Sequence, residues 1–309
     1  ESASVGARYQ RGLEAGSKAE LLIALPNIRD RESLIICNGY KDAEFVEMGL
    51  YARLIGLKCF FVIETLRELP IIIERSKAMG VKPLIGVRMR LSTTVDGHWA
   101  QDSGEQSIFG LTPAHLIEAV DELRKADMLQ LLHTHLGSQI PNIRNIRSGV
   151  LEACRYYTSL VEEGAAMGYL DLGGGLAVDY DGSQSNNAHS MNYRLDEYCV
   201  DVIETIIETL EPSGIPHPVI VTESGRATVA YSSLLLFNVL DVRKPESAKL
   251  PESLDDDTHE LILNLKTVLD NVDSDKLQEN FNDAVYYRDE LTELFRRGQL
   301  GLRERAIGD

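Results

Sequence analysis

The chain has 309 residues, of which 44% are hydrophobic and 26% charged, so it can bury one barrel-sized core or a domain with an appendage. Its formal net charge of -17 argues against a nucleic-acid-binding surface. No apolar run is long enough to cross a membrane and no signal peptide is recognisable, so we expect a cytoplasmic protein without a membrane partner. The four scattered cysteines predict reduced thiols and not a disulfide framework.

Short apolar runs alternate with helix-length amphipathic segments, a pattern typical of parallel strands joined by helical crossovers. We expect seven strands, at residues 12–15, 34–38, 59–64, 84–90, 129–135, 169–172 and 219–223. Helices are expected between them, at residues 42–55, 65–79, 113–126, 144–163 and 195–210. The prediction is an α/β protein with a TIM-type (β/α)8 barrel that lacks one strand. A doubly wound open sheet is the alternative, but it usually binds ligands at one switch point.

The pattern changes after Val242. Residues 243–254 are polar and contain proline, and two helices are expected at residues 258–272 and 275–297. We therefore divide the chain into an incomplete barrel domain at residues 1–242 and a helical appendage at residues 243–309.

Polar and glycine residues stand where the expected strands end, which is where the active groups of TIM-type barrels gather. They are Glu14, Asn38, Arg90, His135, Gly173 to Gly175, and Glu223 to Arg226. Three consecutive strands thus finish in groups suited to holding a phosphate.

His133 and His135 are two residues apart on one strand, so both side chains point to the same face. A zinc pair would need further ligands, and no Cys or His of suitable spacing follows, so a metal site is not predicted. A hydrogen-bonded core histidine is the other interpretation. His135 lies nearer the strand end, whereas His133 lies one pleat deeper and is predicted to be a packing residue.

The run Gly173-Gly174-Gly175 directly follows an apolar strand. Backbone N–H groups of such a run can approach an anion closely, although a tight loop that needs positive φ explains the glycines equally well. Glu223, Gly225 and Arg226 follow Val-Ile-Val-Thr, a setting in which an ordinary solvated surface pair is improbable.

The order His-x-His-x-Gly-Ser at 133–138, Asp-x-Gly-Gly-Gly at 171–175 and Glu-x-Gly-Arg at 223–226 resembles the pyridoxal-phosphate decarboxylases that act on arginine, ornithine and diaminopimelate. Five longer segments resemble the biosynthetic arginine decarboxylases in particular: 12–20, 36–42, 131–139, 171–181 and 191–193. The helices at 278–305 also resemble that family's helical insertion. The fold implied is a barrel of the alanine-racemase-like kind.

The resemblance implies decarboxylation of L-arginine to agmatine and CO2 for putrescine and spermidine synthesis. It also implies pyridoxal 5′-phosphate, usually Mg²⁺, and a homo-oligomer, either a dimer or a tetramer. A related ornithine or diaminopimelate decarboxylase, or a non-catalytic regulatory homologue, are the alternatives.

The resemblance assigns roles to the residues at the strand ends, with His135 and Glu223 as the catalytic pair. His135 would stack on the pyridine ring and Glu223 would keep the ring nitrogen protonated. The implied cofactor contacts are Glu14, Arg90, His135, Ser138, Gly173, Gly174, Gly175, Glu223, Gly225 and Arg226. The implied substrate contacts are Asp171, Leu172, Gly173, Gly174, Gly175, Leu176, Asp179 and Asp181.

Three departures from the family pattern stand out. Relatives carry the lysine that binds the cofactor on a strand before the segment at 12–20, and residues 1–11 contain no lysine. The chain also stops before the family's β-rich C-terminal domain, so we expect a fragment that is inactive by itself. Ile108 stands where relatives usually have a basic residue.

Overall fold

The computed structural model describes residues 11–95, 104, 107–124, 127–242, 250–251, 253–255 and 257–309. The chain forms two compact units, residues 1–235 and residues 236–309. The boundary expected from the sequence, between residues 242 and 243, stays a prediction, because residue 243 lies outside the described part. Within that part, no helix is long and apolar enough to cross a membrane.

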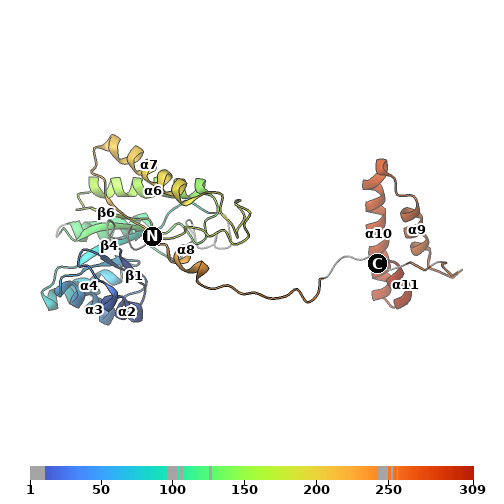
Figure 1. Cartoon of the computed structure of the whole chain (residues 1–309), viewed down its shortest axis with the longest axis horizontal. Coiled ribbons are helices and arrows are strands. Elements are labelled where there is room, and N and C mark those ends of the chain that lie inside the picture. Colours follow the sequence, from blue (N-terminus) through green and yellow to red (C-terminus); the bar gives the residue numbers. More distant parts are fainter. Residues whose placement is uncertain are drawn as a thin grey trace. The chain divides into compact units, whose positions relative to one another are not determined.

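The first unit is built on one parallel sheet in which each strand pairs with the next one along the chain (Figure 1). The strands are β1 (Leu13–Ala15), β2 (Leu34–Cys37), β3 (Lys58–Ile63), β4 (Leu84–Met89), β5 (Leu129–Thr134), β6 (Tyr169–Asp171) and β7 (Val219–Val221). All seven expected strands are present, with ends within two residues of those predicted. A doubly wound sheet would reverse its strand order at a switch point. The sequential order therefore confirms the barrel-type prediction.

The sheet is curled. The side-chain amide of Asn38, at the end of β2, donates a hydrogen bond to Glu223 Oε1, just after β7, over 2.8 Å. A flat sheet would hold these two strand ends five strands apart. The contact shows that the carboxyl ends of the strands curve around a shared inner face.

The helices follow the strands in alternation, and because the sheet is curled, α2 to α4 and α6 to α7 cover the same outer face, below and above the strands in Figure 1. Their bounds are α2 (Lys18–Asn27), α3 (Ala43–Leu54), α4 (Glu68–Met79), α5 (Pro113–Leu123), α6 (Ile143–Glu162), α7 (Leu195–Leu210) and α8 (Gly225–Val229). Asp42 and Thr112 cap α3 and α5 with their side chains. The five predicted helices are therefore confirmed, although the expected end of the third, Ala126, lies outside the described residues.

The two faces of the sheet differ because side chains alternate along each strand. Alternate residues of β2 to β4 are 0–2% exposed and pack against the helices: Ile35, Cys37, Cys59, Phe61, Ile63, Ile85, Val87 and Met89. The intervening residues Leu34, Ile36, Phe60 and Val62 form a smaller apolar layer on the inner face, together with Leu131 of β5. Closer to the carboxyl ends of the strands, the inner face becomes polar.

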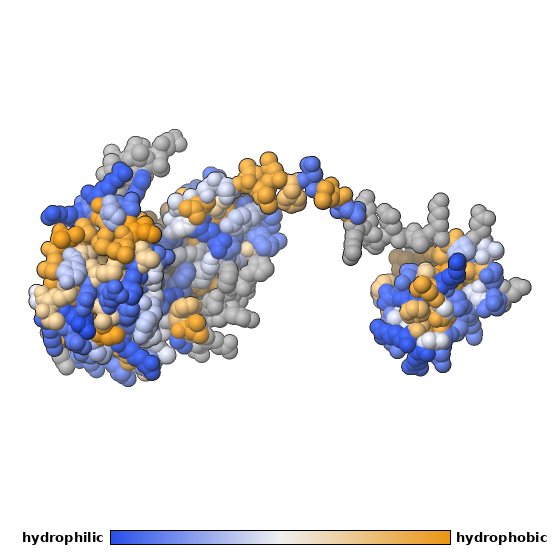
Figure 2. Space-filling model, turned by 90° about the horizontal axis from the view of Figure 1, so that it is seen from below, coloured by the Kyte–Doolittle hydropathy of each residue, from blue (hydrophilic) through white to orange (hydrophobic). Residues whose placement is uncertain are grey.

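The segment after α8 carries exposed apolar side chains, visible as an orange stretch in Figure 2. Leu234, Leu235, Leu236 and Phe237 are 76–84% exposed. The second unit contains α9 (Glu260–Asp270), α10 (Leu277–Arg296) and α11 (Leu302–Ile307). Its core is small, with Ile262, Leu291 and Leu300 buried. Both helices expected in the appendage are confirmed.

Candidate active site

A cluster of polar side chains lies on the inner face, at or just beyond the carboxyl ends of the strands. Each of the seven strands contributes to it. The members are Glu14 (β1), Asn38 (after β2), Glu64 (after β3), Arg88 (β4), His133 and His135 (β5 and just beyond), Asp171 (β6) and Glu223 (after β7). The cluster collects residues that are far apart in the sequence, as expected for the active end of a barrel.

Glu223 is half-buried and held from two sides. Its side chain accepts the hydrogen bond from Asn38, and its backbone N–H donates to the Gly173 carbonyl over 2.8 Å. Burial raises the pKa of Glu223 to about 7, with Asp171 and Glu14 adding to the shift and His133 opposing it. The carboxyl group is therefore poised between its two protonation states near neutral pH.

His135 is a neutral imidazole at physiological pH. Burial, together with the positive charges of Arg88 and His133, lowers its pKa to about 4. Its Nδ1 atom is buried and has no hydrogen-bond partner. A Cβ atom at Gly174 would lie 3.5 Å from Cε1 of the ring, so this glycine borders the imidazole. The ring can stack on an aromatic ligand without adding charge.

Ser138 and Arg226 meet at the exposed end of the cluster. The Arg226 guanidinium donates to Ser138 Oγ over 3.0 Å and to the Tyr180 hydroxyl over 3.2 Å. Gly225 begins α8 directly before this arginine. A guanidinium beside a hydroxyl, at the surface, is suited to an anion such as phosphate.

The glycine run needs glycine for two distinct reasons. Gly173 and Gly175 have φ of 61° and 115°, which other residues rarely adopt. A Cβ atom at Gly173 would also lie 2.4 Å from the Thr134 carbonyl oxygen. The tight-loop interpretation thus holds for these two glycines, while Gly174 lies beside His135.

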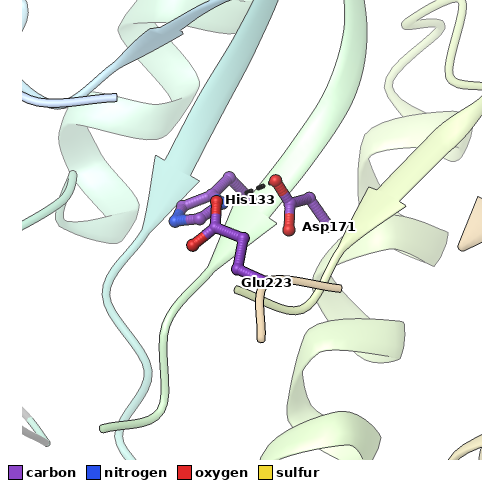
Figure 3. A group of neighbouring side chains, drawn as sticks. All are labelled: His133, Asp171 and Glu223. Carbon is purple, nitrogen blue, oxygen red and sulfur yellow. Dashed lines mark ion pairs between the residues drawn. The ribbon is translucent and has the colours of Figure 1, made fainter. Parts of the chain in front are cut away.

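His133 and Asp171 form a buried pair beneath Glu223 (Figure 3). They are 1% and 0% exposed, and His133 Nδ1 lies 3.0 Å from Asp171 Oδ2. Ligand-type atoms of the three residues lie within 4.8 Å of one another, a spacing that suits an ion pair or a cation. His133 is as buried as a packing residue should be, yet its neighbours are charged.

Arg88 and Glu64 are members of the cluster that the sequence interpretation missed. Arg88 Nη1 lies 3.0 and 2.9 Å from the two carboxylate oxygens of Glu64, and the guanidinium lies 5.0 Å from the centre of the Phe109 ring. Strand alternation was the available signal, because residues 86, 88 and 90 share a face. Arg90, which was predicted instead, follows β4 and donates to the carbonyls of Phe109 and Gly110 over 3.4 Å.

The other predicted residues include Glu14 and Asp171, which belong to the cluster, and residues of the neighbouring loops. Glu14 is accessible on β1, and Leu172 packs toward the helices with 8% exposure. Leu176 is half-buried in the loop after the glycine run. Asp179 accepts a hydrogen bond from Ser190 Oγ over 2.6 Å, and Asp181 accepts one from the Ser183 backbone over 2.9 Å. Asp171 has its second oxygen occupied by the Gly173 N–H at 2.9 Å.

The fold is that of a barrel-type protein with a polar cluster at the carboxyl ends of its strands. Residues 4–230 match the family model described as the pyridoxal-binding domain of pyridoxal-dependent decarboxylases. The chain therefore belongs to the pyridoxal-dependent decarboxylase family. Residues 255–309 match a second model, described as the arginine decarboxylase helical bundle domain.

The names of individual relatives are consistent with this family. The chain is 46% identical to a biosynthetic arginine decarboxylase of Synechococcus sp. (strain RCC307), covering 97% of this chain and 47% of that protein. It is 41% identical to one of Bacteroides thetaiotaomicron, covering 99% and 49%. The chain thus spans about half the length of the curated relatives it matches.

Solved structures agree on the fold. The crystal structure of the biosynthetic arginine decarboxylase SpeA from Campylobacter jejuni is 33% identical, with a TM-score of 0.66 over 99% of this chain and 50% of that one. A diaminopimelate decarboxylase from Helicobacter pylori is 21% identical, with a TM-score of 0.58 over 72% of this chain and 53% of that one. At that identity the second likeness shows the fold alone.

Proposed function

We propose that this chain is the barrel and helical part of a biosynthetic arginine decarboxylase, which converts L-arginine to agmatine and CO2. The observation that supports the cofactor site is the contact of Arg226 with Ser138, 88 residues apart in the sequence. It places a cation and a hydroxyl together at the open end of the cluster. The choice of arginine as substrate rests on relatives named biosynthetic arginine decarboxylase, at 41–46% identity. It also rests on the match to the arginine decarboxylase helical bundle model.

The residues present fit pyridoxal phosphate. Arg226 and Ser138 would bind its phosphate, with Gly225 beside them, and neutral His135 would lie against its ring. The unpartnered, buried Nδ1 of His135 marks a polar atom left free for a ligand or water. When bound, the cofactor supplies an electron sink for the electron pair that remains as CO2 leaves.

The residues of this chain would bind, orient and hold protons. Glu223, as a carboxylate, would hold a proton at the ring nitrogen, and Asn38 would fix its orientation through the 2.8 Å hydrogen bond. Gly174 would leave room beside His135 for a flat ring. Glu14, Arg90, Asp179 and Asp181 remain proposed contacts through the family resemblance.

The remaining proposals concern the whole protein. Only the resemblance to the biosynthetic arginine decarboxylases suggests Mg²⁺. Among the described residues, the single candidate cation cluster includes an imidazole, a ligand that Mg²⁺ rarely takes. We also propose a cytoplasmic homo-oligomer with a small-molecule substrate.

Release of labelled CO2 by the full-length protein tests the function. Arginine should be turned over far faster than ornithine, lysine or diaminopimelate. Equal or faster release from diaminopimelate would assign the protein to the alternative decarboxylase. No release from any of the four, in protein that binds the cofactor, would favour the regulatory homologue.

A further inference from the structure

The pair of His133 and Asp171 is not used by the proposed function. In the strand register, Arg88 lies opposite His133 on one side and Asp171 lies opposite it on the other. Three charged side chains from β4, β5 and β6 thus stand in one row across the inner face. His133 and Asp171 are almost completely buried, and Figure 3 shows Glu223 beside the imidazole.

We propose that His133 is a positioning residue whose imidazolium, held by Asp171, keeps the neighbouring Glu223 ionised for its work on the cofactor ring. This inference rests on the proposed function. His133 would not touch cofactor or substrate. Its effect would pass through the carboxylate of Glu223.

Glu223 needs such help because its surroundings favour the neutral acid. The titratable and polar groups that share the inner face with Glu223 are Glu14 from β1, Asn38 after β2, Glu64 after β3, Arg88 from β4, His133 and His135 from β5 and its end, and Asp171 from β6. Burial, Asp171 and Glu14 all raise its pKa, whereas His133 and the Asn38 hydrogen bond lower it. The Arg88 charge is engaged with both oxygens of Glu64.

His133 can carry this charge despite its burial. Burial disfavours the imidazolium, but Asp171 and Glu223 outweigh it, so the pKa of His133 is raised above 6.5 in spite of Arg88. Neither His133 Nδ1 nor Asp171 Oδ2 makes a regular hydrogen bond, although the two atoms lie 3.0 Å apart. With these two buried atoms 3.0 Å apart, protonated His133 would form an ion pair in which Asp171 stabilises the positive charge.

If His133 served only to fill space, its neighbours would be different. A histidine that only fills space would be interchangeable with an apolar residue of similar size and would lie among apolar side chains. Leu132, the next residue on β5, has such a setting, since it is fully buried in the core between sheet and helices. It provides a matched control, because Leu132→Val changes packing on the same strand without changing charge near Glu223.

The first test measures the pKa of Glu223 by carboxyl-carbon NMR in the full 309-residue chain without cofactor. We expect His133→Gln to move the midpoint upward from about 7, His133→Lys to restore it in part, and Leu132→Val to leave it unchanged. An unchanged midpoint in folded His133→Gln would overturn the proposal. Should His133→Gln fail to fold, nitrogen NMR of the unmodified chain decides: imidazolium signals for His133 at pH 7 support the proposal, and neutral imidazole signals overturn it.

The second test uses the full-length protein. In His133→Gln the acid limb of the kcat profile should move to higher pH while KM for arginine stays unchanged. A limb that moves by about one pH unit lowers the rate at a given acidic pH about tenfold. A uniform fall in kcat at all pH values would mean a structural role and overturn the proposal.

Two further outcomes are distinguishable from these. An upward NMR midpoint in a full-length protein that decarboxylates nothing would leave the electrostatic pairing in place and refute the proposed function instead. One stoichiometric zinc, lost in His133→Gln, would overturn the positioning role.

Discussion

The helix-facing and inner faces of the same strands carry different kinds of side chain. On β3, Phe61 and Ile63 are fully buried against helices, whereas Glu64, just beyond the strand, points to the inner side and binds Arg88. On β5, Leu132 lies in the main core while His133 and His135 lie in the polar cluster. The alternation of side chains thus assigns stability to one face and ligand chemistry to the other. Substitutions on the helix-facing side should lower stability, whereas substitutions on the inner side should weaken ligand binding.

The largest expected effect is on the helix-facing side. Phe61→Ala should lower the free energy of unfolding by about 3–5 kcal/mol, since it opens a cavity beneath Gly49 of α3, where a Cβ atom would lie 2.5 Å from the Phe61 ring. Urea denaturation measures this. Tyr51→Ala, on the same helix but 60% exposed, should change the value by no more than about 0.5 kcal/mol. Equal losses in both variants would contradict the division between faces.

The next effect is on the ligand-binding side. Arg226→Ala should weaken pyridoxal-phosphate binding by about 1.5–3 kcal/mol, roughly ten- to a hundredfold, through loss of a charge-assisted phosphate contact. Absorbance titration of the full-length protein gives the dissociation constant. Arg194→Ala, whose side chain is 85% exposed, serves as the control for loss of one positive charge. If Arg226→Ala kept the affinity of the unmodified protein, Arg226 would not bind the phosphate.

His135→Ala should weaken cofactor binding less, by about 0.5–1.5 kcal/mol or up to roughly tenfold, because it removes a ring contact and no charge. It should also shift the cofactor's absorbance band and lower turnover. His115→Ala on α5 is exposed and should do neither. An unaltered spectrum in His135→Ala would refute the stacking role.

The smallest effect is a pH dependence of stability. The folded-state pKa of Glu223, about 7, lies above its ordinary 4.5, so its contribution favours the folded state more as pH falls from about 7 to 4.5. His135 has a folded-state pKa of about 4, below its ordinary 6.5, and contributes in the opposite direction between 6.5 and 4. Glu223→Gln should therefore make unfolding free energy fall more steeply with acidification than in the unmodified chain. Parallel curves from urea unfolding across this range would be the contrary result.

The sequence predicted features that depend on local order along the chain. The seven strands follow from apolar runs between turns, and the nearness of Ser138 to Arg226 follows from motifs at strand ends. The pairing of Arg88 with Glu64, and of His133 with Asp171, depends on register between strands separated by whole helices. A slip of one residue in that register would place these side chains on the other face. The sequence therefore predicted which strand ends carry polar residues that meet in space, but not the buried charges beneath them.

Pyridoxal phosphate should bind on the inner face, at the carboxyl end of this sheet. A crystal structure of the full-length protein with bound cofactor tests it most directly. We expect the phosphate beside Ser138 and Arg226, the ring against His135 and its nitrogen at Glu223, with His133 making no contact. Cofactor density on the helix-facing side, or in another part of the protein, would contradict the claim.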